Sequence, residues 1–378
     1  MNNLSVEKFR KYFPYLNNGI IYFNHASTGP VPSTTAARLK SIIEVKSNEC
    51  PDDYQSFLKV MTETKEDLGR LVNCSPDRIA FLDNTTNGLN LLALGIEWKK
   101  GDRILLNDVE FPANVYPFLN LKRFGVEVDF IRAESGFVTA EQIIDSVKPE
   151  TKLISVSFVQ FISGYKINLE KLGNYCRNNN IIFCVDAIQG IGAVAIDVTK
   201  SKIDYLSCGT QKWLLGMQGL AFIYVDENLQ RKMIPANLGW LSVENAWDLL
   251  NYDVTPKSTA SVFQGGTLNL LGIYAFNSSL KIFHDFGVVN VEKEILKNSR
   301  YFISALKKIG VESVLSNCSD DELAGIVTVK LNSADRVVAE LQKKKIFCSL
   351  REGQIRFSPH FYNIIQEINT VVDELKKL

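Results

Sequence analysis

The chain has 378 residues, of which 46% are hydrophobic and 22% are charged, as is typical of soluble globular proteins. Its 42 basic residues balance its 42 acidic residues, so no net charge favours nucleic acid or an anionic membrane as a partner. No segment approaches the ~20 apolar residues that cross a bilayer, and the N-terminus lacks the apolar core of a signal peptide. Seven cysteines without metal-type spacing and three scattered histidines predict free thiols in a cytoplasmic protein and no metal site.

The N-terminal region predicts a short helix and a loop within residues 1–20, followed by a short strand at residues 21–23. That strand leads into a polar segment that contains His25 and Ala26 and ends in a Gly-Pro-Val-Pro turn. A lone histidine in such a segment is more often packed in the structure than used as a base.

The first strand of the core is expected at residues 79–82, and an amphipathic helix is expected at residues 89–96. The polar turn between them contains Thr85 and Thr86. Such a turn can bind an anion, because the free N–H groups and the dipole of the helix both point at it. A plain N-cap by either threonine explains the same residues equally well.

Strands and helical patterns then alternate along the chain. Strands are expected at residues 104–107, 126–131 and 153–158, and helices at residues 140–147 and 169–179. The alternation predicts a mostly parallel sheet covered by helices on both faces. Phe111 follows the first of these strands, and its ring suits either the core or the face of a planar ligand.

The central stretch of the chain places a carboxylate and a lysine after neighbouring strands. A buried strand at residues 181–185 leads into Asp186, and a second strand at residues 204–207 leads towards Lys212. Each residue alone is unremarkable in such a place. Together they are the pair that pyridoxal phosphate requires, a lysine for the Schiff base and a carboxylate for the ring nitrogen.

The C-terminal part of the chain predicts a second region. A loop-rich stretch ends at Gly266 and Thr267, which precede a long helix at residues 270–283, and Thr267 could simply cap that helix. Beyond residue 288 the pattern predicts an α+β region. Arg356 lies in the middle of a strand there, where its guanidinium could clamp a carboxylate.

These motifs resemble the class V aminotransferase family of fold-type I pyridoxal-phosphate enzymes. Its core pattern matches Asp186-Ala187-Ile188-Gln189 and Gly209-Thr210-Gln211-Lys212-Trp213. The resemblance implies a large domain at residues 21–285 with a mostly parallel seven-stranded sheet. It also implies a smaller α+β domain at residues 286–378, and we expect residues 1–20 to pack on that domain.

The resemblance also implies roles for individual residues. The catalytic residues are expected to be Lys212, Asp186 and Arg356. The pyridoxal 5'-phosphate contacts are expected from Thr85, Thr86, Phe111, Asp186, Gln189, Gly209, Thr210, Gln211, Lys212, Gly266 and Thr267. Substrate contacts are expected from Arg356, His25 and Ala26, and Arg351 is expected to be a structural ion-pair partner. The protein is expected to be a homodimer in which Thr267 reaches the cofactor phosphate of the partner.

Transamination between a small amino acid and a 2-oxo acid is the expected activity. The alternatives are a cysteine desulfurase or C–S lyase without a persulfide cysteine, and an epimerase of the isopenicillin-N type. Phe161 and Gln211 replace an asparagine and a histidine of the desulfurases, and Cys348 lies upstream of the tight turn at Gly353. We therefore predict that no persulfide forms on Cys348. A non-enzymatic scaffold or a dinucleotide-binding protein explains the motifs less well.

Overall fold

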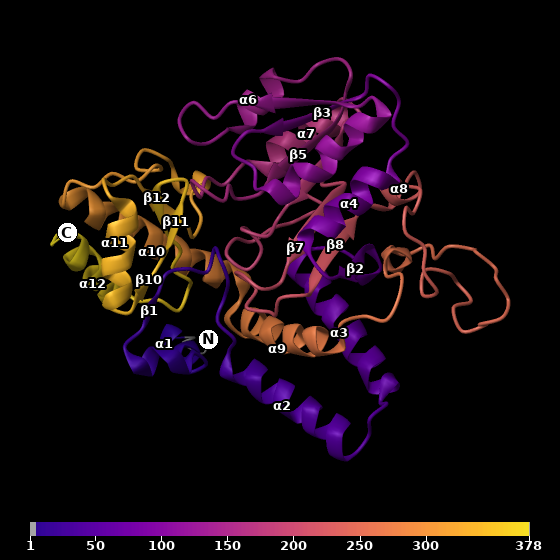
Figure 1. Cartoon of the computed structure of the whole chain (residues 1–378), viewed down its shortest axis with the longest axis horizontal. Helices are drawn as coiled ribbons and strands as arrows, with labels where there is room; N and C mark the ends of the chain where they lie inside the picture. Colours follow the sequence, from indigo (N-terminus) through magenta and orange to yellow (C-terminus); the bar gives the residue numbers. More distant parts are fainter. Residues whose placement is uncertain (1–4, 378) are drawn as a thin grey trace.

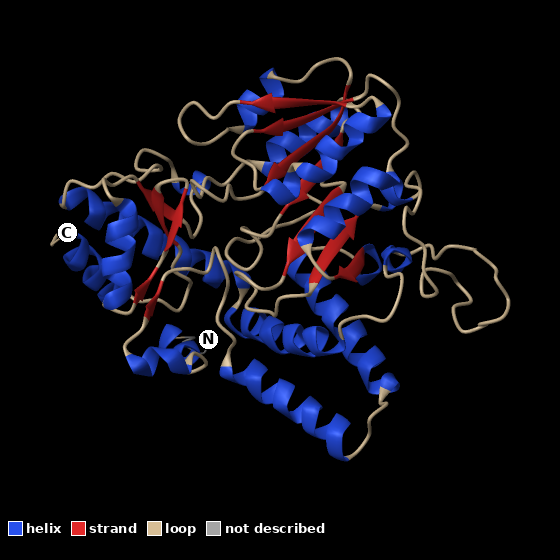
Figure 2. Cartoon of the chain, viewed as in Figure 1, coloured by secondary structure: helices blue, strands red, loops and turns tan. Residues whose placement is uncertain are grey.

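The computed structural model describes residues 5–377 and contains one large seven-stranded sheet (Figures 1 and 2). The strands are β2 (Ile79–Leu82), β3 (Arg103–Asn107), β4 (Glu127–Ile131), β5 (Thr151–Ser157), β6 (Ile182–Asp186), β7 (Tyr205–Gly209) and β8 (Ala221–Val225). Their order in the sheet is β2-β8-β7-β6-β5-β3-β4. β8 is antiparallel to both of its neighbours, and the other pairs are parallel. The predicted mostly parallel sheet is therefore confirmed.

Alternate residues of the strands contribute to two separate hydrophobic cores, one on each face of the sheet. On β8, Phe222 and Tyr224 belong to one core, whereas Ile223 and Val225 belong to the other. All five residues of β8 are buried. This pattern follows from the two-residue period of a strand, and it explains why the sequence of the strand is continuously apolar.

Helices cover both faces of this sheet. They are α2 (Ser33–Asn48), α3 (Tyr54–Val72), α4 (Thr85–Gly95), α5 (Tyr116–Leu119), α6 (Ala140–Asp145), α7 (Leu169–Asn178), α8 (Glu227–Gln230) and α9 (Leu270–Phe286). α4 packs on β7 and β8, and α9 packs against α2 and α3 (Figure 1). Within residues 5–377, none of the helices combines the length and the apolar character that crossing a bilayer requires.

A second group of elements follows α9. It comprises α10 (Val288–Lys308), β9 (Val327–Val329), α11 (Ala334–Lys343), β10 (Ile346–Phe347), β11 (Ser349–Arg351), β12 (Gln354–Phe357) and α12 (Ile365–Leu375). β11, β12 and β9 form an antiparallel sheet in that order, with α10 and α11 packed beside it. Figure 2 shows these elements as a body beside the large sheet.

The N-terminal segment packs on this C-terminal group. In α1 (Val6–Arg10), the Arg10 guanidinium donates to a Glu367 carboxylate oxygen at 2.8 Å. The ring of Phe13 stacks on Tyr362 with centroids 3.6 Å apart. β1 (Ile21–Tyr22) pairs with β10, so the contact extends past residue 20, where the sequence analysis ended this segment. The first four residues of the segment lie outside the described residues.

A long loop between α8 and residue 260 projects from the body of the molecule, at the right of Figure 1. It carries large apolar side chains on its surface: Ile234, Leu238, Trp240, Trp247, Leu249, Leu250, Tyr252 and Val254. Leu250 and Tyr252 are 86% and 87% exposed. Several large exposed apolar side chains on one loop are typical of an interaction surface.

Candidate active site

The centre of the candidate site lies where two neighbouring strands end. β6 ends at Asp186, which is the register partner of Ser207 on β7. β7 ends at Gly209, and the chain then turns through Lys212. Because parallel strands end at one edge of a sheet, the structure brings together the carboxylate and the lysine that the sequence predicted as a pair.

Burial perturbs the protonation of both groups. Asp186 is 2% exposed and accepts a hydrogen bond from the Ile188 N–H at 3.1 Å. Loss of water raises the pKa of Asp186, and the nearby carboxylate of Glu110 raises it further. Burial lowers the pKa of Lys212, and the attraction to Asp186 opposes that shift only in part. Perturbed groups of this kind are concentrated at functional sites.

The N-terminus of α4 provides an anion-binding feature. Asn84 caps the helix by accepting the Asn87 N–H at 2.8 Å, so the alternative of a cap by Thr85 or Thr86 is wrong. The Thr85 hydroxyl is buried and has no hydrogen-bond partner within the described part of the chain, whereas Thr86 is exposed. A helix N-terminus beside an unpartnered hydroxyl suits a phosphate group.

Gly209 keeps space open in front of this hydroxyl. A Cβ atom at Gly209 would lie 3.2 Å from Thr85 Oγ1 and 2.5 Å from Gln211 Oε1. The next residue, Thr210, is buried, and its hydroxyl donates to two backbone carbonyl oxygens, each at 3.0 Å. Thr210 therefore holds the turn with its hydroxyl, and that group is not directed at a ligand.

Phe111 and Gln189 border the lysine turn from different sides. The Phe111 ring is 45% exposed, and its centroid lies 5.7 Å from Lys212 Nζ. Phe111 is thus at the site and outside the core. The Gln189 amide donates to the Ala26 carbonyl oxygen and accepts from the Trp213 indole N–H, both at 2.9 Å. One amide N–H of Gln189 remains for a ligand.

Arg356 on β12 enters the site from the C-terminal group. It is 2% exposed, and it donates to the Phe161 carbonyl oxygen at 2.7 Å and to the Ser27 hydroxyl at 3.0 Å. Its Nε is buried without a partner among the described residues. Arg351 donates to the same Ser27 hydroxyl at 3.2 Å. No carboxylate of the described residues pairs with Arg351, so the predicted ion-pair role is wrong.

His25 does not present a polar atom to the site. It is fully buried, and its Nδ1 donates to the Ser358 carbonyl oxygen at 2.9 Å while its Nε2 accepts from the Tyr362 hydroxyl. Burial, together with neighbouring His360, keeps its pKa well below the usual range, so the ring is neutral. The expected substrate contact of His25 is therefore corrected to a structural role. Ala26 is 1% exposed and contributes its carbonyl oxygen to Gln189.

Gly266 and Thr267 precede α9 and line a cavity together with Asp83, which lies just before α4. Thr267 is exposed, and α9 is capped by Asn269, which accepts the Gly272 N–H at 2.9 Å. The interpretation of Thr267 as a simple N-cap is therefore wrong. Its side chain is available to another molecule.

A family model described as aminotransferase class-V matches residues 21–367. The chain belongs to the class V aminotransferase family. Two curated relatives span nearly the whole chain. A probable cysteine desulfurase of Methanothermobacter thermautotrophicus is 25% identical and covers 99% of this chain and 98% of its own. An uncharacterized aminotransferase of Bacillus subtilis is 25% identical, and the match covers 98% of this chain and 97% of the relative.

Solved structures of other proteins share the fold of this chain. The cysteine desulfurase of Thermococcus onnurineus superimposes with a TM-score of 0.90 at 21% identity, covering 100% of this chain and 99% of its own. The cystine C–S lyase C-DES, bound to cysteine persulfide, has a TM-score of 0.89 at 22% identity. The match covers 97% of this chain and 99% of the lyase chain. At these identities the likeness shows the fold alone.

Pyridoxal 5'-phosphate is the cofactor of this class V enzyme, and the residues of the site fit it. The buried Asp186 carboxylate could hold the ring nitrogen, and the unpartnered Thr85 hydroxyl at a helix N-terminus suits the phosphate. Phe111 offers an exposed ring beside Lys212. Gly209 leaves the space that a side chain would fill.

Glu110 is a buried residue of the site that the sequence did not reveal. Its carboxylate accepts from the amide groups of Asn107 and Asn114, and from the Ser157 N–H and hydroxyl. Ser157 is in turn the register partner of Asp186. Burial raises the pKa of Glu110, and these four donors oppose the rise. The signal in the sequence was weak, an acidic residue three positions after the end of β3.

Cys348 lies between β10 and β11, half-buried against the core. Burial raises its pKa to about 12, so the thiolate is scarce at neutral pH. β11 and β12 are joined by a tight turn at Glu352 and Gly353, and no flexible loop separates them. The predicted absence of a persulfide on Cys348 stays a prediction.

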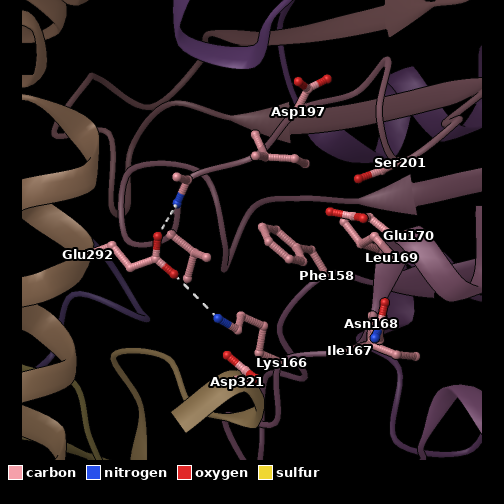
Figure 3. Close-up of a pocket in the computed structure, with 13 residues that line it drawn as sticks. Phe158, Lys166, Ile167, Asn168, Leu169, Glu170, Asp197, Ser201, Glu292 and Asp321 are labelled. Atoms are coloured by element: carbon pink, nitrogen blue, oxygen red, sulfur yellow. Dashed lines mark hydrogen bonds and ion pairs between the residues drawn. The ribbon is translucent and has the colours of Figure 1, made fainter.

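A separate cavity of about 230 Å³ lies beside the contact between the large sheet and α10 (Figure 3). Glu292 of α10 crosses this contact and accepts from the Lys166 amine at 3.3 Å and from the Ala195 N–H at 3.1 Å. None of the predicted active-site residues lines this cavity. We assign Glu292 to the joining of the two groups of elements.

Proposed function

We propose that this class V enzyme is an aminotransferase of a small amino acid, with Lys212 as its acid–base group. The observation that supports this proposal most directly is the lysine of lowered pKa beside a buried carboxylate at the ends of adjacent strands. We further propose a large domain at residues 21–285 and a small domain at residues 286–378.

Each residue has a role in this proposal. When bound, the cofactor withdraws electrons from the substrate Cα and carries the amino group. Asp186 holds the proton on the ring nitrogen, and Arg356 binds the α-carboxylate with N–H groups left free by its contacts to Phe161 and Ser27. Lys212 takes the proton from Cα, because its lowered pKa supplies neutral amine at moderate pH.

We prefer transamination over β-elimination because neither histidine packed near the site offers a free ring nitrogen as an additional acid for a leaving group. His25 and His360 are fully buried with their ring nitrogens bonded inside the chain, so neither serves a leaving group. C–S bond cleavage without an enzyme persulfide is the second candidate. The names of the desulfurase and C–S lyase relatives favour it.

We propose that the active unit is a homodimer. Thr267 is exposed and lies between α9 and the long loop that carries large apolar side chains on its surface. A second copy of the chain would cover this surface. Thr267 of each copy would then reach the cofactor phosphate that is bound by the other copy.

The proposal is tested with the purified holoenzyme and a panel of amino acids and 2-oxo acids. Transamination predicts that a small amino acid changes the absorption of the bound cofactor, and that a 2-oxo acid reverses the change. Formation of pyruvate, ammonia and sulfide from L-cysteine, with no reversal by a 2-oxo acid, would favour the second candidate instead.

Cys348 separates the two routes of sulfur release. We predict that Cys348→Ala leaves any release of sulfide from L-cysteine within about twofold of the unchanged protein, because the buried thiol is a poor nucleophile. Mass spectrometry after incubation with L-cysteine checks for an added sulfur atom. A persulfide on Cys348, with activity lost in the variant, would contradict this prediction.

A further inference from the structure

One face of the small antiparallel sheet carries a cluster of polar side chains next to Lys212. Arg356 is the register partner of Ser349, and Arg351 is the register partner of Gln354. Directly paired residues share a face, as do alternate residues of a strand. These four side chains therefore lie on the same face, and the charges of both arginines act on Lys212.

The two guanidinium groups have more free donors than one carboxylate uses. Each arginine has five N–H groups. Arg356 donates one to Phe161 and one to Ser27, and Arg351 donates one to Leu350 and one to Ser27. Three N–H groups thus remain on each side chain. A bidentate clamp on one carboxylate needs two of them.

No negatively charged side chain of the described residues pairs with either arginine. Within residues 5–377, neither guanidinium forms a salt bridge. Burial lowers the pKa of Arg356 to about 9, and the positive charge of Arg351 lowers it as well. Two adjacent cations, one of them buried, repel each other until an anion arrives.

Unpartnered polar atoms lie on the same face. The Ser349 hydroxyl, on a residue that is 7% exposed, has no hydrogen-bond partner among the described residues, and neither does Arg356 Nε. Buried polar groups normally find partners. Their lack of partners indicates that a polar ligand completes this face.

We propose that Arg351 and Arg356 form a subsite for two acidic groups, so that the substrate is an amino acid with an acidic side chain. The side chain would end in a carboxylate or a sulfinate. Arg356, the more buried arginine, binds the α-carboxylate, and the partly exposed Arg351 binds the second acidic group. Ser27 accepts a hydrogen bond from both guanidinium groups and sets their spacing. This inference rests on the proposed function and names its substrate class.

The test compares acidic amino acids with their neutral counterparts. The holoenzyme is titrated with L-aspartate, L-cysteine sulfinate, L-asparagine and L-alanine while the absorption of the bound cofactor is recorded. We expect at least one acidic ligand to bind about tenfold or more tightly than asparagine and alanine, because charge-assisted hydrogen bonds are the stronger ones. The two acidic ligands distinguish a carboxylate from a sulfinate as the preferred group.

Three variants assign the preference to Arg351. Arg351→Gln should remove the acidic preference, weakening the binding of the acidic ligand about tenfold more than the binding of alanine, and Arg351→Lys should restore part of the preference. Arg336→Gln changes an exposed arginine of α11 and should leave the dissociation constant of every ligand unchanged. Equal binding of aspartate and asparagine by the unchanged protein, or a preference that survives Arg351→Gln, would overturn the proposal.

A second readout needs no cofactor. Succinate should raise the melting temperature of the cofactor-free protein more than propionate does, and Arg351→Gln should abolish the difference, because ligands of the folded state stabilise it. Equal effects of the two acids would contradict the subsite. If the cofactor spectrum responds to no amino acid while succinate still stabilises the protein, the proposed function fails and the subsite stands.

Discussion

At the scale of single residues, the structure buries several ionisable side chains. They differ in the number of hydrogen bonds that compensate for the loss of water. Glu110 accepts four hydrogen bonds, and Arg356 donates to two oxygen atoms of the chain. Lys65 is a third case, because it is 8% exposed and, within residues 5–377, its amine donates only to the Ser261 hydroxyl, at 2.9 Å. A buried charge with one neutral partner costs stability.

Lys65→Met should stabilise the protein at neutral pH. Burial lowers the pKa of Lys65 to about 8, well below its ordinary value of 10.5. Replacing the amine should raise the free energy of unfolding by up to about 3 kcal/mol at pH 7. The folded-state pKa is the lower one, so the gain is complete below pH 8 and disappears as the pH rises from about 8 to 10.5.

Denaturant titrations at pH 7 and pH 10.5 measure this difference. Lys59→Met changes an exposed lysine of the same helix and serves as the control. A loss of stability in Lys65→Met at pH 7, or a gain that does not depend on pH, would show that the buried charge is not the cause.

At the scale of elements, α10 joins the two groups of strands and helices through Glu292 (Figure 3). Glu292→Ala should lower the free energy of unfolding by about 1–2 kcal/mol, because two hydrogen bonds to a partly buried carboxylate are lost. Denaturant titration of the variant and the unchanged protein measures this difference in the free energy of unfolding.

Glu294→Ala is the matched control on the same helix. Among the described residues, Glu294 pairs only with Lys297, which lies three residues along α10 and has a side chain that is 56% exposed. Removal of Glu294 should therefore cost about 0.5 kcal/mol or less. If Glu292→Ala and Glu294→Ala lowered the free energy of unfolding equally, that result would contradict a joining role for Glu292.

The sequence predicted most elements because their patterns are local. The strand expected at residues 181–185 occupies Ile182–Asp186, and the helix expected at residues 169–179 occupies Leu169–Asn178. The lysine and carboxylate were predictable because both follow strands of one sheet. The contact that Arg351 and Arg356 share at Ser27 was not predictable from the sequence. Ser27 is 324 positions from Arg351 and 329 positions from Arg356. The packing of His25 against Ser358 and Tyr362 depends on a similar distance in sequence.

At the scale of the whole molecule, the apolar loop before residue 260 makes a lone copy an incomplete enzyme in our proposal. Leu250→Asp together with Tyr252→Asp should turn a dimer into a monomer and weaken retention of the cofactor. The reason is that both side chains are almost fully exposed in a single copy and would be desolvated between two copies.

Sedimentation velocity measures the mass of the unchanged protein and of this double variant. Val289→Asp replaces a 68% exposed apolar residue on α10, away from the loop, and should leave the mass unchanged. A monomeric unchanged protein that retains full activity would contradict the dimer.

The central claim is that Lys212 carries the cofactor, and covalent trapping tests it most directly. The holoenzyme is treated with borohydride, digested, and mapped by mass spectrometry, with Lys212→Ala as the control. We predict a reduced cofactor adduct on the peptide that contains Lys212, and none in the variant. An adduct on another lysine, or no adduct on a protein that holds the cofactor, would contradict the account.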